Sequence, residues 1–310
     1  MLISIAIPAF NATTTITRTL ESVYCGELPD DWRVETVIVD DGSTDSLDLE
    51  KQVSGYNDSQ LIRHSVNRGM CAARNTGIDY TKGDLVIILD SDDELVNEWP
   101  RALQAIMRDW PEECNLCFAA CRNQDGIITA TNPGFQGYHY LDDLLNERNS
   151  GEYLPIFRGD YIRENRYVDL GLRKSCGIVS YIKFALDSPF WISSQVLRIY
   201  HQSRAGSVTQ GWTAPDKAAE TARCYEALFE RYGNLYRERA PAIYRTKQLR
   251  LSVYLKLAQL RGVWSAYKKG ASLMVPWETI GVAVILLIGP RMAGKLVSYM
   301  KDVGIVRRYG

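Results

Sequence analysis

The sequence predicts an α/β fold built around a mostly parallel sheet. Short apolar runs of strand length recur through the first half of the chain, and polar turns or stretches with helical periodicity separate them. Strands that alternate with helices form βαβ units, in which the strands run parallel. The length of 310 residues allows one such domain and a smaller appendage.

Four strands and three helices are expected in this first half. The first strand is stopped by Pro8, and no charged leader or cleavage site precedes it, so a signal peptide is not expected. The expected strands are Leu2–Ile7, Val34–Val39, Leu61–Ser65 and Leu85–Leu89. The expected helices are one with Ile16, Leu20, Val23 and Tyr24 on one face, a second over Arg68–Tyr80 and a third over Trp99–Trp110.

The pattern changes after residue 115. The runs Asn115–Cys121 and Ile127–Thr131 predict a β-hairpin, because the turn-forming sequence Asn123–Gly126 lies between them. A short helix is expected over Tyr138–Arg148, and helix and strand signals mix over Leu154–Ser203. We therefore expect an α/β domain over residues 1–212.

The remaining residues, 213–310, have a helical pattern with breaks near Gly270 and Pro276. The last fifty residues carry eight Lys or Arg and two acids, a net charge of +6 in a chain whose total is −1. An uncharged run of 12 residues, Thr279–Pro290, lies among these cations. Because a spanning helix needs about 20 apolar residues, this run predicts an interfacial anchor on an anionic membrane surface. The alternative is a helix buried against the rest of the protein.

The overall composition excludes two classes of protein. A near-neutral total, with Lys+Arg 36 and Asp+Glu 37, gives no indication of nucleic-acid binding. Seven cysteines without regular spacing favour reduced thiols in a cytoplasmic chain over a disulfide framework. Cys114, Cys117 and Cys121 could form half of a metal site, but the other half is missing and a core position is the better interpretation.

The most informative stretch is Leu85–Asp93, an apolar run that ends abruptly in acid. Such a run is a buried strand that delivers Asp90 and Asp92 to the edge of the sheet. Crowded carboxylates repel each other unless a hard cation lies between them, and Mg²⁺ or Mn²⁺ holding a diphosphate is the expected guest. The alternative is an ordinary turn in which Asp and Ser cap a helix.

Other polar loops follow the neighbouring strands. In an open α/β sheet the ligand lies beyond the carboxyl ends of the strands, where Asp40 and Asp41 can accept hydrogen bonds from a base or a ribose. Arg68 and Arg74 lie near the start of a helix, a favourable place for phosphate. On their own, these arginines are better explained as a solvated helix face.

Four motifs follow one another along about the first hundred residues: Ile3–Asn11, Val37–Asp45, Asn67–Gly77 and the DXD-like Leu89–Asp93. In this order they resemble those of the family 2 glycosyltransferases, and Leu197–Thr209 extends the resemblance more weakly. The resemblance implies a GT-A fold, a Rossmann-like and mostly parallel mixed sheet flanked by helices, here with a C-terminal helical extension. It also implies a metal-dependent enzyme that uses nucleotide-diphosphate sugars.

The same resemblance implies roles for individual residues. Pro8, Ala9 and Phe10 would line the base, Asp40 or Asp41 would hold the base or ribose, and Arg68 and Arg74 would approach the diphosphate. Asp90 would face the ribose and sugar, and Asp92 would bind the metal, with Asp90 and His201 as further candidate ligands. Arg204 and Ser207 fall where the family has donor-phosphate contacts.

The chain departs from the family where the catalytic base is expected. Many inverting members carry a Glu-Asp pair at the helix that follows the acceptor site, but here no carboxylate occurs over Leu170–Leu186. A positioned base contributes about 10²–10⁴-fold in rate. Asp169 or Asp93 could take over, or catalysis could be weak, absent or of another stereochemical type.

The sequence therefore predicts a glycosyltransferase, of inverting type, on the cytoplasmic face of the cell membrane. Its expected donor is a UDP-sugar and its expected acceptor a hydroxyl of a growing glycan, lipid-linked and destined for the surface. One rival is a non-catalytic scaffold that keeps the donor site but lacks the base. A nucleotidyltransferase is a weaker rival, because residues 9–13 lack the Gly-rich, basic loop that such enzymes carry after the first strand.

Overall fold

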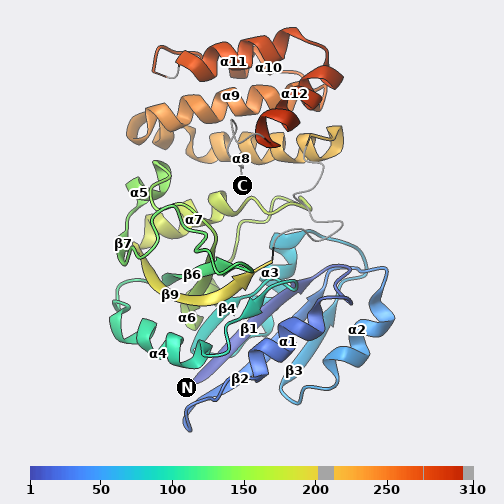
Figure 1. Cartoon of the computed structure of the whole chain (residues 1–310), viewed down its shortest axis with the longest axis vertical. Helices are drawn as coiled ribbons and strands as arrows, with labels where there is room; N and C mark the ends of the chain where they lie inside the picture. Colours follow the sequence, from blue (N-terminus) through green and yellow to red (C-terminus); the bar gives the residue numbers. More distant parts are fainter. Residues whose placement is uncertain (202–212, 275, 303–310) are drawn as a thin grey trace. The chain divides into compact units, whose positions relative to one another are not determined.

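The computed structural model describes residues 1–201 and 213–302 except residue 275 (Figure 1). The chain divides into two compact units, residues 1–204 and 205–310. The strands of the first unit are β1 (Leu2–Ala9), β2 (Arg33–Asp40), β3 (Ser59–Arg63), β4 (Leu85–Ile88), β5 (Glu94–Leu95), β6 (Leu116–Asn123), β7 (Gly137–His139), β8 (Tyr153–Arg158) and β9 (Phe190–Tyr200). Its helices are α1 (Ile16–Tyr24), α2 (Ser46–Val53), α3 (Met70–Tyr80), α4 (Trp99–Asp109), α5 (Leu141–Leu145), α6 (Gly159–Glu164) and α7 (Gly177–Asp187).

The nine strands form one mixed sheet in the order β3-β2-β1-β4-β8-β6-β9-β5, with β7 also paired to β9. The first four strands are mutually parallel, as the sequence predicts, and β8 is antiparallel to both β4 and β6. Ala9 lies opposite Asp40, and Ala6 lies opposite Ile88, so β1, β2 and β4 end at the same edge. This register brings their three following loops together.

Alternating side chains of β1 face opposite layers of helices. Ile3, Ile5 and Ile7 are fully buried in the cluster that also contains the apolar face of α1. Ala6 faces α3 instead, where the backbone approaches so closely that a Cβ on Gly77 would lie 3.1 Å from the Ala6 Cβ. Figure 1 shows α1 in front of the sheet and α3 behind it. The expected α/β architecture is confirmed.

The prediction that Pro8 stops the first strand is wrong, because Pro8 and Ala9 still pair with Val39 and Asp40 of β2. The third strand is Ser59–Arg63 and lies two residues earlier than expected.

Two further predictions differ in the type of element that forms. Residues 127–131 form no strand, although Ile128 makes an isolated antiparallel bridge to Arg122 and the predicted turn is present. The helix expected over Tyr138–Arg148 is only α5, because Tyr138 belongs to β7 and lies opposite Trp191 of β9. Pairing with a long neighbouring strand overrides the local helical pattern here.

The second unit is helical over the part that the structure describes. Its helices are α8 (Pro215–Arg239), α9 (Pro241–Leu257), α10 (Val263–Gly270), α11 (Pro276–Leu287) and α12 (Pro290–Asp302). The breaks at Gly270 and Pro276 are as expected. Leu249, Leu251, Val253, Leu255 and Leu257 are all buried, so α9 is the centre of this unit and not an exposed amphipathic helix. Tyr254 of α9 stacks on Tyr225 of α8, with ring centroids 5.9 Å apart.

Among the described residues, no helix is both long and apolar enough to cross a bilayer.

Candidate active site

Asp90, in the turn after β4, lies between two arginines. Its Oδ1 is 3.1 Å from a terminal nitrogen of Arg74, and its Oδ2 is 3.7 Å from a terminal nitrogen of Arg198. Burial raises the pKa of Asp90, but the Arg74 and Arg198 guanidinium groups outweigh it and hold the pKa below the ordinary carboxyl range. Since the Asp90 side chain is still 33% exposed, an ionised carboxylate is available at this edge of the sheet.

Asp93, three residues later, has the opposite environment. Only 1% of the residue is exposed, its Oδ1 accepts a hydrogen bond from the His201 backbone N–H at 2.9 Å, and its Oδ2 is 3.2 Å from Arg198. Burial raises the pKa of Asp93 to about 8, with Arg198 opposing the shift and Asp90 adding to it. The proton of this carboxyl is therefore held more tightly than that of an exposed aspartate.

Arg198 of β9 is buried and contacts both aspartates. Its side chain is 4% exposed, and besides Asp90 and Asp93 it lies 3.5 Å from Glu152 and donates from Nε to Cys121 Sγ at 3.2 Å. An unpaired guanidinium in such a place would cost several kcal/mol, so the surrounding carboxylates are what make its burial possible. Our sequence analysis missed Arg198. The available signal was a cation between Leu197 and Ile199 in an apolar strand.

Asp40 and Asp41, at the end of β2, are buried and bonded to the protein. Asp40 Oδ1 accepts a hydrogen bond from the Ser43 backbone N–H, and Asp40 Oδ2 pairs with Arg63. Asp41 Oδ1 is 2.7 Å from His64 Nδ1, and the carboxylate also accepts from two backbone amides, Arg68 N–H at 2.9 Å and Gly69 N–H at 2.8 Å. In this arrangement Asp41 fixes the loop that leads into α3.

Gly69 gives that loop its shape. Its φ of +96° is a backbone conformation that favours glycine, and a Cβ there would lie 2.0 Å from the Leu172 carbonyl oxygen. The segment before α7 therefore packs directly on the start of α3. Ser175 of the same segment has its hydroxyl 3.5 Å from Arg74, so the structure brings it to the Arg74–Asp90 pair.

The predicted phosphate-binding arginines are placed differently from each other. Arg68 is exposed, whereas the Arg74 side chain is 11% exposed and lies over the Tyr167 ring at 5.5 Å. In the described residues the buried Nε of Arg74 has no hydrogen-bond partner. Arg74 is thus a cation held by Asp90 and Tyr167.

The loop after β1 presents a partly exposed aromatic residue. Phe10 is 44% exposed, while Ala9 is buried and Pro8 is half-buried. Asn11, with φ of +50°, ties this loop to the next one: its N–H donates to Ser43 Oγ, and its Oδ1 accepts from Thr44 N–H. The structure thus joins the two loops expected at the base and ribose.

Comparison with known proteins identifies the family. The sequence model described as Glycosyl transferase family 2 matches residues 4–159, half of the chain. The chain belongs to this family. The protein is therefore a glycosyltransferase, and the matched region overlaps all four motifs of its first hundred residues.

Several relatives of known name share this assignment. A GalNAc(5)-diNAcBac-PP-undecaprenol beta-1,3-glucosyltransferase of Campylobacter jejuni is 23% identical over 217 residues, 67% of each chain. An undecaprenyl-phosphate 4-deoxy-4-formamido-L-arabinose transferase of Aeromonas hydrophila is 34% identical, over 68% of this chain and 73% of the relative. The putative glycosyltransferase EpsH of Bacillus subtilis is 26% identical over 53% of this chain, and the chain matches only 49% of its length.

The fold is that of solved GT-A structures. The crystal structure of S. aureus TarS 1-349 in complex with UDP-GlcNAc superposes with a TM-score of 0.58, covering 91% of this chain and 79% of that one, at 16% sequence identity. At this identity the likeness concerns the fold alone. The GT-A prediction for this family 2 glycosyltransferase is confirmed.

The acidic turn has the right donor chemistry for a divalent cation. Asp90 and Asp92 both follow β4, each is partly exposed, and carboxylate oxygens suit Mg²⁺ or Mn²⁺. In the described ranges no three His, Cys, Asp or Glu side chains come together as a closed metal cage. A site of two carboxylates still fits, because Mg²⁺ commonly keeps waters and takes its other ligands from substrate phosphates.

His201, the third expected metal ligand, has other contacts in the structure. Its Nε2 is 2.5 Å from Glu94 Oε1, and its Nδ1 is 2.7 Å from the Gln124 side-chain amide. Both ring nitrogens of His201 therefore already have partners. Its backbone N–H also donates a hydrogen bond to Asp93. Its role as a ligand stays a prediction. Arg204 and Ser207 lie outside the described residues.

The two candidate bases occupy contrasting positions. Asp169 is exposed in the turn before α7, and its Oδ1 accepts from the Gly171 N–H at 2.9 Å. Asp93 is enclosed and paired with Arg198, as described above. A general base must come within hydrogen-bond reach of the acceptor proton, and of the two only Asp169 is open to solvent.

Proposed function

We propose that this glycosyltransferase moves a sugar from a nucleotide-diphosphate donor, a UDP-sugar, to a hydroxyl of a lipid-linked surface glycan. The observation that carries the proposal is the ionised Asp90, held between Arg74 and Arg198 and adjacent to Asp92, at the shared edge of β1, β2 and β4. The names of the Campylobacter and Aeromonas relatives refer to undecaprenol-linked substrates, and the TarS structure contains UDP-GlcNAc, which supports both halves of the proposal.

In this proposal Asp90 and Asp92 hold Mn²⁺ or Mg²⁺ together with the donor diphosphate. When bound, the metal neutralises the negative charge that develops on the departing nucleoside diphosphate. Arg74 keeps Asp90 ionised and adds positive charge beside the position proposed for the diphosphate. Asp41 accepts hydrogen bonds from the Arg68 and Gly69 amides and so fixes the loop that leads into α3. Phe10, in the loop after β1, receives the base.

We assign the acceptor side to Asp169 and propose an inverting reaction. Asp169 is exposed next to the segment that packs on α3, and residues 170–186 contain no carboxylate. Asp93 would have to leave Arg198 and the His201 amide to reach an acceptor, so we assign it to positioning the turn. The rival is a donor-binding scaffold without turnover, which the missing acid pair favours.

A donor panel separates the enzyme from the scaffold. Purified protein is incubated with UDP-glucose, UDP-galactose or UDP-GlcNAc and Mn²⁺, Mg²⁺ or EDTA, and both thermal shift and released UDP are measured. An enzyme raises its Tm with one donor in a metal-dependent way and slowly releases UDP. A metal-dependent Tm shift with no UDP release, even with undecaprenyl-linked acceptors present, would establish the scaffold instead.

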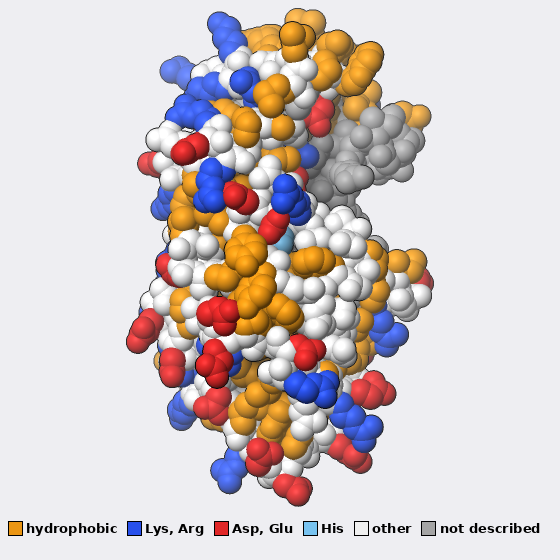
Figure 2. Space-filling model, turned by 90° about the vertical axis from the view of Figure 1, so that its left-hand side faces the viewer, with side chains coloured by type: hydrophobic (Ala, Val, Ile, Leu, Met, Phe, Trp, Pro, Cys, Tyr) orange, Lys and Arg blue, Asp and Glu red, His pale blue; other side chains and the backbone are white. Residues whose placement is uncertain are grey.

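We further propose that the second unit binds the surface of an anionic membrane, on the cytoplasmic side. Trp277, Ile280, Val284 and Leu287 are all more than half exposed and recur along one face of α11, while Ile285 and Leu286 on its other face are buried. The interpretation as an interfacial anchor thus describes the outward face of α11, and the interpretation as a buried helix describes its inward face. Figure 2 shows hydrophobic side chains over the C-terminal helices with Lys and Arg beside them. Such a surface suits an interfacial contact.

Vesicle co-sedimentation tests this association. Binding to phosphatidylglycerol vesicles should exceed binding to phosphatidylcholine vesicles and should weaken as salt is raised from low to high concentration. Absence of binding to either vesicle at low salt would rule the association out.

A further inference from the structure

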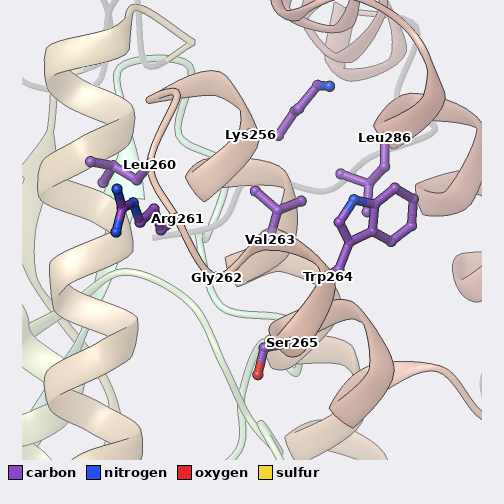
Figure 3. Close-up of a pocket in the computed structure, with 8 residues that line it drawn as sticks. All are labelled: Lys256, Leu260, Arg261, Gly262, Val263, Trp264, Ser265 and Leu286. Carbon is purple, nitrogen blue, oxygen red and sulfur yellow. The ribbon is translucent and has the colours of Figure 1, made fainter.

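A surface cavity of about 410 Å³, wide open to solvent, lies on the second unit between the end of α9, the start of α10 and α11. Its walls are partly apolar: Leu260, Val263, Trp264 and Leu286 line it. Figure 3 shows the Trp264 indole extending toward Leu286 of α11. The volume lies within the range of ordinary small-molecule sites, which is about 300–1,000 Å³.

Two cations line the same cavity. Lys256 comes from the last turn of α9, and Arg261 comes from the link between α9 and α10. Within the described part of the chain neither one forms an ion pair, in contrast to the paired arginines of the first unit. The cavity therefore combines unpaired positive charge with apolar walls, which is complementary to an anionic amphiphile.

The exposed apolar surface adjoins this cavity. Leu286 lines the cavity, and its chain neighbour Leu287, which is 77% exposed, belongs to the outward face of α11. Trp264 is itself 51% exposed, so the cavity wall continues onto the surface. Figure 3 shows the Lys256 and Arg261 side chains extending in different directions, so both have to turn toward the pocket to meet one phosphate. A lipid whose chains lie against the outward face of α11 would place its head group at this pocket.

We propose that this cavity binds the head-group phosphate of an anionic membrane lipid, with Lys256 and Arg261 as its cationic contacts and Trp264 against the glycerol and upper chain. This inference rests on the membrane association proposed above and adds a defined site to it. Arginine and lysine are the usual protein contacts of phosphate, and an indole suits the boundary between head group and chain.

The test compares two pairs of charge substitutions. The cavity variant is Lys256→Gln with Arg261→Gln. The control is Arg291→Gln with Lys295→Gln, which removes the same charge from two exposed residues of α12 that do not line the cavity. Both are measured by co-sedimentation with vesicles containing phosphatidylglycerol. We expect the cavity variant to bind about tenfold more weakly than the control, because it loses specific phosphate contacts in addition to two charges.

A second readout places the lipid at the cavity. Vesicles whose phosphatidylglycerol chains carry bromine quench indoles close to them, so quenching of the wild type should exceed that of Trp264→Phe and should fall in the cavity variant. Water-soluble dioctanoyl phosphatidylglycerol and inorganic phosphate form further arms. If the short lipid reduces the quenching of Trp264 by brominated vesicles at concentrations where inorganic phosphate has no effect, the site is a lipid site. If inorganic phosphate reduces the quenching equally, the lipid site is overturned.

The outcomes separate this inference from the proposed association. Equal losses in the cavity variant and the control, with wild-type binding intact, would overturn the cavity site and leave membrane association standing. No wild-type binding to anionic vesicles would remove both. UDP release without vesicles should stay unchanged in both variants, since their substitutions lie outside residues 1–204. A Tm and a helical circular-dichroism signal equal to those of the wild type show that the second unit is folded in both variants.

Discussion

The two units of this glycosyltransferase treat charge in opposite ways. In the first unit, Arg74 and Arg198 are buried and paired with Asp90 and Asp93. In the second, Lys256 and Arg261 have no ion-pair partner in the described residues, and the large apolar side chain of Trp264 is exposed beside them. Buried charges need partners inside the protein, whereas exposed cations and apolar groups are available to partners outside it.

The contrast indicates two kinds of binding site. The first unit holds a preorganised polar site, whose charges are fixed before any ligand arrives. The second unit offers a surface whose unsatisfied groups fit a membrane. Substitutions in the first unit should therefore affect sugar transfer and folding. Substitutions in the second unit should affect binding to a membrane surface.

The largest effect is expected at Asp92. Asp92→Ala removes a predicted metal ligand from the turn after β4, so sugar transfer should fall by ~10³-fold or more and donor binding should lose its metal dependence. Kinetics with Mn²⁺ and calorimetry with the donor measure both. Asp125→Ala, a substitution of an exposed aspartate elsewhere, is the control. Turnover of Asp92→Ala near the wild-type rate would show that the metal site lies elsewhere.

Asp169→Asn tests the acceptor side of the same unit. It removes a proton acceptor without touching the metal turn, so donor affinity should stay intact while the transfer rate falls by ~10²-fold or more. Asp160→Asn is a matched control, because that carboxylate is exposed and, in the described residues, pairs with the neighbouring Arg163. Unchanged turnover in Asp169→Asn would eliminate it as the base, and a joint loss of affinity and rate would indicate a folding defect.

Arg198→Met breaks the buried pairing directly. It leaves Asp90 and Asp93 without their shared cation, and the free energy of unfolding should fall by about 3–5 kcal/mol. Arg166→Met removes a surface pair with Asp79 and should cost less than about 1 kcal/mol. Denaturant titration of both variants gives the comparison. A similar small loss in both would mean that Arg198 is not essential to the interior of this unit.

The raised pKa of Asp93 predicts a pH dependence. Because its pKa is about 8 in the folded state, the native state holds this proton more tightly than the unfolded state, and stability from this group is lost as pH rises toward 8. Asp93→Asn cannot lose the proton, so its free energy of unfolding should improve relative to the wild type between pH 5 and pH 8. Urea titrations across this range measure the difference. A constant difference would show that Asp93 does not titrate there.

The smallest effect on stability is expected on the outward face of α11. Trp277→Ser and Leu287→Ser lie at exposed positions and should change the free energy of unfolding by less than about 0.5 kcal/mol while weakening binding to anionic vesicles. Leu286→Ala, one residue away on the buried face, should cost about 2–5 kcal/mol. Similar destabilisation in all three would show that the outward face is packed and not free to bind a membrane.

Local sequence was sufficient for much of the first unit. The acids after β2 and the acids after β4 mark where those strands end, because such residues interrupt apolar runs in a way that needs no knowledge of distant parts. The four motifs predicted the family and the fold for the same reason. Gly270 and Pro276 likewise marked the helix ends of the second unit. Pro8 does not mark a strand end, since β1 continues to Ala9.

What only the tertiary structure decided was which of these residues pair. Asp90 and Asp93 are the same residue type and lie three positions apart, so the sequence does not distinguish them. Their carboxyls nevertheless have opposite pKa shifts, because they differ in burial and in their contacts with arginines such as Arg198, more than a hundred positions away. Tyr138 became part of a strand because β9 lies beside it, and the leucines of α9 became a core because α8 and α10 cover them. Strand ends depend on nearest neighbours in the chain, whereas burial and charge pairing depend on neighbours in space.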